Sequence, residues 1–212
     1  MQPTPPGWYW DPGNRPGLFR WWDGHAWTEA LSASRTREAP APLDLPTPGP
    51  DGRFSGGGLS VPALAEPWRP CPPYPAQLEG AVGQELVVGR TPRGPYLAAV
   101  FVGALAPQLT GNDLAASTVG LADAVLQTYY PHERPSARPD PSVVEVDGRP
   151  ACRLVVPMDV DDGNLDFTTE AAVFALVDVG TPSAGVLFAS LPDVEHVPSA
   201  DDVLAQLQLA PK

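Results

Sequence analysis

The sequence is poor in cysteine, histidine and lysine. Its 212 residues contain two cysteines (Cys71 and Cys152), three histidines in separate segments, and a single lysine at position 212. Two cysteines are too few for a disulfide framework or a thiolate metal site, so we expect two reduced, structural thiols. No pair of histidines has the short spacing typical of a zinc site. We therefore predict no bound metal and no cofactor.

A long hydrophobic run is also missing. No stretch approaches the ~18 consecutive apolar residues that a transmembrane helix needs. The N-terminal sequence MQPTPPGWYW lacks the charged leader and apolar run of a signal peptide. These absences predict a cytoplasmic protein with no integral membrane segment.

Catalytic motifs are absent as well. The sequence contains no Gly-x-Ser-x-Gly nucleophile elbow, and Cys152 falls inside a predicted strand. The three glycines 56–58 are not followed by the Gly-Lys-Ser/Thr of a phosphate loop, so we interpret them as a flexible lead-in to the second part of the chain. We predict no catalytic residue and no enzymatic activity.

Acidic residues outnumber basic ones. The chain carries 25 acidic and 13 basic residues, a formal net charge of −12. Because nucleic-acid phosphates repel such a chain, nucleic acid is not an expected partner. Residues 1–37 carry a net charge of +1, which leaves −13 for residues 38–212. The acidity of the second part either keeps its surface soluble or attracts a basic site on a partner.

The densest acidic cluster is the segment MDVDDGNLDFTTE. Its carboxylates are Asp159, Asp161, Asp162, Asp166 and Glu170. Asp159 and Glu170 occupy the first and last positions of a twelve-residue segment, as in an EF-hand. However, Asn164 stands where that calcium loop needs glycine, and strands instead of helices are predicted on both sides. We interpret the segment as an exposed acidic hairpin loop, with cation binding as the alternative.

Tryptophan is the residue in excess near the start. Five of the six tryptophans lie within the first 27 residues. The segments WYW, LFRWW and HAWTE are typical of three short strands, and Asp23-Gly24 is typical of a two-residue type I′ turn. So small a unit needs indole rings to bury enough surface. We expect Trp8, Trp22 and Trp27 to be core residues and Trp10 or Trp21 to be exposed.

These motifs resemble a known family. GWYWDP followed by RWWDGHAWT is similar to the short Trp-rich domain of unknown function found at the N-termini of many actinobacterial proteins. The matching residues are Gly7, Trp8, Tyr9, Asp11, Pro12, Arg20, Trp22, Asp23, Gly24, Trp27 and Thr28. Trp10 stands where the family usually has proline. Because many relatives carry a transmembrane helix, the resemblance implies a module presented on the cytoplasmic side of a membrane, and peripheral association with a membrane complex is an open expectation.

The Trp-rich unit also has the size and plan of a WW domain, which binds polyproline segments on aromatic side chains. By this analogy we predict that Tyr9, Trp10 and Trp21 bind a protein partner. The expected ligand is an extended or proline-rich segment, either of the partner or of the chain itself at residues 40–50.

Three regions are expected along the chain. Residues 1–30 form the Trp-rich β module, and residues 31–53, which hold five prolines between Pro40 and Pro50, form a semi-extended linker. Residues 54–212 form an α+β domain with an antiparallel sheet. Its expected helices run from about Asn112 to Tyr130, with Thr110 and Asp113 as a capping box, and over residues 199–209, with Ser199 and Asp202 as another.

Strands are expected at residues 85–89, 96–105, 169–179 and 184–191, together with a hairpin around Asp147-Gly148. This order of elements over residues 54–210, with the strand VDGRPACRLV after the long helix, is similar to the PsbP-like α/β/α sandwich of the LpqN type. The resemblance implies a binding or assembly protein. We predict a non-catalytic adaptor or chaperone; the alternative is a small-ligand-binding protein or enzyme with a pocket between sheet and helix.

Overall fold

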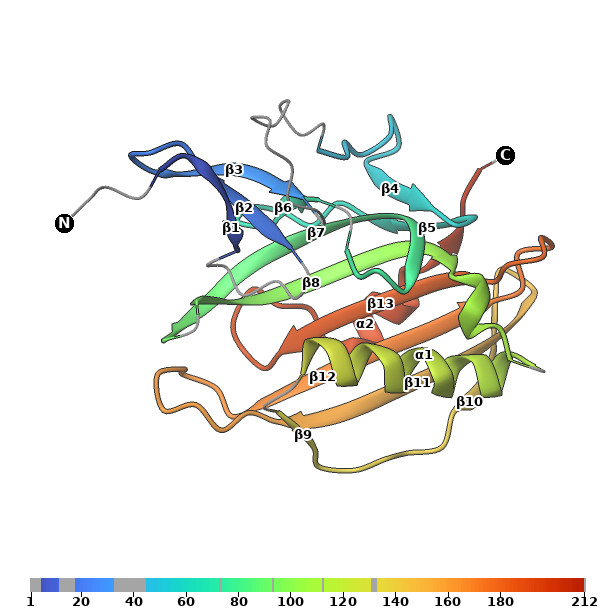
Figure 1. Ribbon diagram of the computed structural model, residues 1–212. Helices are drawn as coiled ribbons and strands as arrows, with labels where there is room; N and C mark the ends of the chain where they lie inside the picture. The colour runs from blue at the N-terminus through green and yellow to red at the C-terminus, as the bar shows by residue number, and fades with distance from the viewer. Residues whose placement is uncertain are drawn as a thin grey trace.

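The computed structural model describes residues 5–11, 18–32, 45–72, 74–92, 94–111, 113–130 and 133–211. The chain has a mixed α+β fold built mainly from antiparallel strands, as predicted (Figure 1). None of the described helices is long and apolar enough to cross a membrane. Both cysteines are free and buried, which agrees with structural thiols.

The Trp-rich segment forms the expected three-stranded meander. Its strands lie in the order β1 (Gly7–Trp10), β2 (Phe19–Trp22) and β3 (Trp27–Ser32), and both pairs are antiparallel. We refer to these strands and their described connections as the Trp module.

The turn between β2 and β3 differs from the prediction. Trp22 pairs with Trp27, so residues 23–26 form the loop and the expected two-residue turn is wrong. The Oδ1 atom of Asp23 accepts hydrogen bonds from the backbone N–H groups of His25 and Ala26, both at 2.7 Å. An aspartate side chain that accepts a hydrogen bond from the backbone N–H two residues later favours this wider turn. Of residues 23–26, only Gly24 has a positive φ, +102°, whereas a type I′ turn needs two such residues.

An eight-stranded antiparallel sheet forms the centre of the second part. Seven strands follow the order β10-β11-β12-β13-β8-β7-β6, and β9 pairs with the end of β11. The bounds are β6 (Arg69–Cys71), β7 (Leu78–Thr91), β8 (Gly94–Leu105), β9 (Arg134–Pro135), β10 (Ser142–Val146), β11 (Arg149–Asp159), β12 (Thr169–Val177) and β13 (Gly185–Pro192).

Both faces of this sheet are covered. Helix α1 (Leu114–Tyr129) packs on one face, where Leu121 and Val125 contact a core that includes Phe101 and Phe174 (Figure 1). The other face is covered by helix α2 (Ala200–Ala205) and a second, three-stranded sheet. That sheet has the order β14-β5-β4, with bounds β4 (Arg53–Gly56), β5 (Leu59–Pro62) and β14 (Gln208–Leu209).

The helix boundaries follow from their caps. Asp113, not Thr110, is the N-cap of α1, because its carboxylate accepts the N–H of Ala116. Thr110 instead ends the short 3₁₀ helix η1 (Pro107–Leu109). The helix itself is confirmed, over Leu114–Tyr129. The capping box of Ser199 and Asp202 on α2 is also confirmed, but the helix ends at Ala205 and Gln208–Leu209 form β14, so the expected extent to residue 209 is wrong.

The hairpin between β10 and β11 has the predicted turn. Asp147 and Gly148 both have positive φ, 49° and 73°, and the flanking residues Val146 and Arg149 pair directly. Those dihedrals are what a type I′ turn requires. Of the predicted linker, residues 33–44 lie outside the described residues, and residues 45–50 contain no helix or strand.

The three glycines 56–58 form the tight junction of β4 and β5, so the prediction of a flexible lead-in is wrong. Gly57 has a φ of +60°, and a Cβ added to it would lie 1.9 Å from the carbonyl oxygen of Gly103 on β8. The small sheet therefore approaches the main sheet backbone to backbone at this point. Only glycine fits such a contact.

We predict that Gly57→Ala lowers the free energy of unfolding by about 3 kcal/mol, because the new methyl group adds a steric clash to an unfavourable φ. Gly52→Ala is the matched control, since Gly52 has a φ of +72° but no heavy atom within 4 Å of the added Cβ. Urea unfolding followed by far-ultraviolet circular dichroism measures both variants. Equal losses would show that the contact with β8 contributes nothing.

Candidate functional site

The Trp module has aromatic side chains on both faces. Residues that are directly paired across antiparallel strands share a face. The register between β1 and β2 therefore divides the rings into two sets. One face carries Trp8, Trp10, Phe19 and Trp21, and the other carries Tyr9, Trp22 and Trp27.

We call the first set the Trp10 face. Trp8 and Trp21 meet edge to face at 5.4 Å between ring centroids, and Trp10 stacks on Phe19 at 4.3 Å. Trp8 is buried and Trp10 is 62% exposed, as predicted, whereas Trp21 is half-buried. Trp10 therefore presents most of its indole to solvent at the end of β1.

We call the second set the Tyr9–Trp27 face. Trp27 meets Tyr9 at 6.1 Å and Trp22 at 5.3 Å, both edge to face. Trp22 is half-buried and Trp27 is 42% exposed, so the prediction that both are core residues is wrong. Trp27 is the first residue of the outer strand β3, where neighbours cover only part of a large ring.

Residues that precede β1 contact the Tyr9–Trp27 face. The Tyr9 hydroxyl donates a hydrogen bond to the carbonyl oxygen of Pro5 at 2.9 Å. The Cγ atom of Pro6 lies 3.2 Å from the position that a Cβ would take on Gly24. Tyr9 and the turn before Trp27 thus hold two consecutive prolines.

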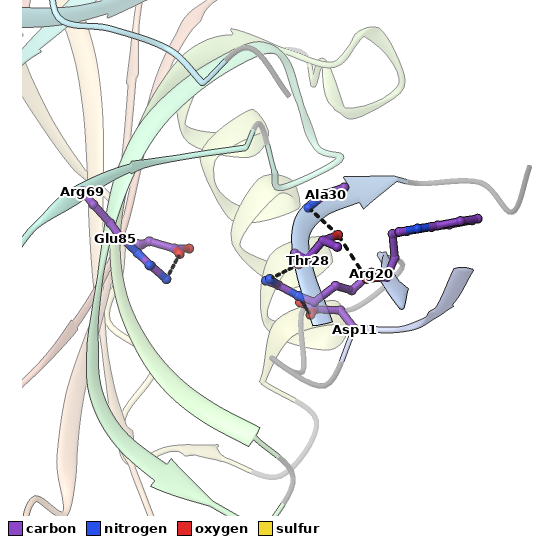
Figure 2. A network of polar contacts seen from close by, with 7 residues as sticks. Asp11, Arg20, Thr28, Ala30, Arg69 and Glu85 are labelled. Carbon is purple, nitrogen blue, oxygen red and sulfur yellow. Dashed lines mark hydrogen bonds and ion pairs between the residues drawn. The ribbon is translucent and has the colours of Figure 1, made fainter. Parts of the chain in front are cut away.

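A buried ion pair joins the three strands of the module (Figure 2). The Nε of Arg20 lies 2.7 Å from Asp11 Oδ1, and its Nη1 donates to the carbonyl oxygen of Thr28 at 2.8 Å. The Asp11 side chain is fully buried. Arg20 on β2 therefore connects the end of β1 to β3.

The second candidate site is a buried carboxylate in the main sheet. Glu170, at the start of β12, is 3% exposed. Its Oε1 accepts hydrogen bonds from the hydroxyls of Tyr130 at 2.7 Å and Ser190 at 2.6 Å, and its Oε2 accepts one from Tyr96 at 2.6 Å. The end of α1 and the neighbouring strands β8 and β13 supply the three donors.

Burial raises the pKa of Glu170, and the charge of Glu133 adds to this, while the three hydroxyl donors act in the opposite direction. Burial and the negative charge of Glu170 likewise hold the pKa of Tyr130 well above its ordinary value. Tyr130 therefore stays a proton donor at neutral pH.

A pocket lies beside this cluster. It has a volume of about 410 Å³ and opens between the C-terminal half of α1 and the β9–β11 region. Tyr130 lines the pocket and also bonds Glu170, so it connects the two. The remaining lining residues are Asp123, Leu126, Gln127, Glu133, Pro135, Arg138 and Met158.

The acidic loop between β11 and β12 does not form an EF-hand. Asp159, Asp161 and Asp166 are exposed, as an acidic hairpin loop predicts, but Glu170 points into the cluster of hydroxyls. Among the residues that the structure describes, no three His, Cys, Asp or Glu side chains are grouped to hold a metal ion.

Sequence reasoning missed two buried glutamates of the main sheet. Glu85 on β7 is also buried, and Arg69 Nη2 lies 3.3 Å from its Oε1 (Figure 2). Each glutamate lies in an otherwise apolar strand segment, ELVVG or EAAVFALV, and this pattern is the signal that could have identified both. His25 and His196 are exposed, and His132 lies outside the described residues.

We predict that Asp11→Asn unfolds the Trp module. The half-buried Arg20 guanidinium would lose its carboxylate, which costs about 3 kcal/mol, and this exceeds the stability expected of so small a unit. Trypsin cleavage after Arg20, followed by mass spectrometry, measures the effect. Asp23→Asn is the control, since asparagine keeps the side-chain acceptor oxygen of the turn. Equal resistance of both variants to cleavage would contradict the prediction.

A second prediction concerns the pH dependence of stability. Because the pKa of Glu170 is raised in the folded state, its contribution is fully present below the ordinary value of 4.5 and is lost as pH rises through the folded value. Relative to Glu170→Gln, the wild type should therefore lose stability as pH rises from 4.5 towards neutrality. Urea unfolding at stepped pH measures this difference.

Tyr96→Phe is the companion variant. It removes a hydrogen bond that lowers the pKa of Glu170, so the loss of stability with rising pH should become larger. Parallel pH profiles for the wild type and Glu170→Gln would show that the carboxyl is not perturbed.

Comparison with known proteins identifies a family for the Trp module. A search of curated proteins finds no match to the chain. Residues 6–42 match the family described as "Protein of unknown function (DUF2510)". The matched segment contains all three strands of the Trp module and confirms the expected N-terminal domain of unknown function.

Proposed function

We propose that the protein is a non-catalytic adaptor or chaperone of an actinobacterium, which acts in the cytoplasm and binds a protein partner through its Trp module. The observation that carries this proposal is the exposure of Trp10, 62%, and of Trp27, 42%, on opposite faces of one small sheet. Exposed indoles are enriched at interfaces because they bury a large area with little loss of conformational freedom.

Trp10 is the strongest of the proposed contact residues. Its indole is already held against Phe19, so a partner would cover a ring whose orientation is largely fixed. Trp21 acts mainly through Trp8, which it packs against, while Tyr9 belongs to the opposite face. Trp10 and Tyr9 therefore cannot contact the same flat partner surface.

For residues 54–212 we propose a PsbP-like α/β/α sandwich of the LpqN type. The order of the strands, the long helix α1 on one face and the second layer on the other support this assignment. Since fold alone does not fix function, the domain's role as holder of a second partner rests on its strong acidity.

A second candidate function has its own support. The pocket of about 410 Å³ combines an apolar wall with Asp123, Glu133 and Arg138, and it touches Tyr130 of the buried cluster. A polar pocket with several titratable groups favours a small-ligand-binding protein or an enzyme. The sheet meanwhile offers no broad apolar groove among its described residues, since both faces are covered.

The adaptor proposal predicts that cross-linked affinity purification from the native host captures a protein with the full chain and loses most of it with Trp10→Ala. Val143→Ala is the matched control, because Val143 is an apolar residue of β10 that is 83% exposed. Equal capture by both variants would contradict a role for Trp10. If the wild-type chain enriches no protein, the pocket becomes the better-supported site.

A further inference from the structure

The Tyr9–Trp27 face already holds a proline-containing segment. Pro5 supplies a carbonyl oxygen to the Tyr9 hydroxyl, and Pro6 packs against the turn at Gly24, directly before Trp27. Both prolines are exposed, and the hydrogen bond is exposed as well. The contact therefore combines an aromatic hydroxyl donor, an adjacent indole and two consecutive prolines.

This combination has a chemical logic. Proline has no N–H group, so a proline-rich segment forms no internal hydrogen bonds and leaves its carbonyl oxygens free to accept. Aromatic side chains with a polar edge suit such a segment, because the ring packs against the pyrrolidine while the hydroxyl or indole N–H donates to a carbonyl. Tyr9 makes this donation to Pro5 within the chain itself.

We infer, on the basis of the proposed adaptor function, that the Tyr9–Trp27 face is a recognition site for a proline-rich extended segment of the partner protein. Pro5 and Pro6 are its resident occupant and leave when the partner segment binds. The hydrogen bond from Tyr9 to Pro5 is exposed and contributes little free energy, so a partner segment can displace the two prolines at little cost. The Trp10 face lies on the other side of the sheet, so it is not part of this recognition site.

A resident occupant raises the apparent dissociation constant of an external segment, because that segment can bind only during the fraction of time in which the face is uncovered. Removing it should therefore tighten binding without any new contact. The test compares the full chain with a variant in which residues 2–6 are replaced by Gly-Ser-Gly-Ser-Gly. The probe is a decaproline peptide, and isothermal titration calorimetry measures its dissociation constant.

We expect the variant to bind decaproline about three- to tenfold more tightly than the wild type. Adding Tyr9→Phe in that background should weaken binding by a similar factor, because only the donor hydroxyl is lost. Adding Trp10→Ala should leave the affinity unchanged, since Trp10 lies on the opposite face. Resistance to trypsin at Arg20 verifies that each module is folded, and a Gly-Ser decapeptide measures non-specific heat.

Three results would overturn the inference. The first is absence of decaproline binding to the variant at millimolar peptide. The second is loss of binding with Trp10→Ala but not with Tyr9→Phe, which would assign the proline site to the other face. The third is an affinity that rises when residues 40–50, and not residues 2–6, are replaced, which would make the linker the occupant. Partner capture that depends on Trp10 without decaproline binding would refute this inference and leave the adaptor proposal standing.

Discussion

The central strands of the main sheet have no polar face, and this determines where the other elements of the second part pack. Residues 172–177 of β12 are all 1% exposed or less, although their side chains alternate between the two faces. A sheet of this kind is stable only when both sides are covered. Helix α1 covers one side, and the small sheet with α2 covers the other.

Burial on both sides also limits where polar groups can lie. Glu170 and Glu85 are buried, and each has hydroxyl or guanidinium donors close to its carboxylate. A buried charge without such donors would cost several kcal/mol. The donors of Glu170 come from three different elements, so its carboxylate connects the end of α1 to β8 and β13. The same side chain lowers the stability of the fold when it is ionised.

Periodicity and turn chemistry were enough to predict the α+β class, the positions of several strands of the main sheet and the helix α1, because these depend on local preference. A comparison of Asp147-Gly148 with Asp23-Gly24 shows the limit of such local preference. The same dipeptide gives a two-residue turn in one hairpin and half of a longer loop in the other, where the Asp23 carboxylate bonds the next backbone N–H groups. The cluster around Glu170 was beyond sequence reasoning, because Tyr96, Tyr130 and Ser190 meet only after the strands pair.

The unequal distribution of tryptophan has an optical consequence. Five indoles lie in the Trp module, whereas Trp68 is the only one in the second part, where it is 7% exposed and donates its Nε1–H to the carbonyl oxygen of His196. Intrinsic fluorescence of the whole chain therefore reports chiefly on the module. Trp10 and Trp27 are open to aqueous quenchers while Trp68 is shielded, so quenching at successive emission wavelengths separates the two parts within one unlabelled molecule.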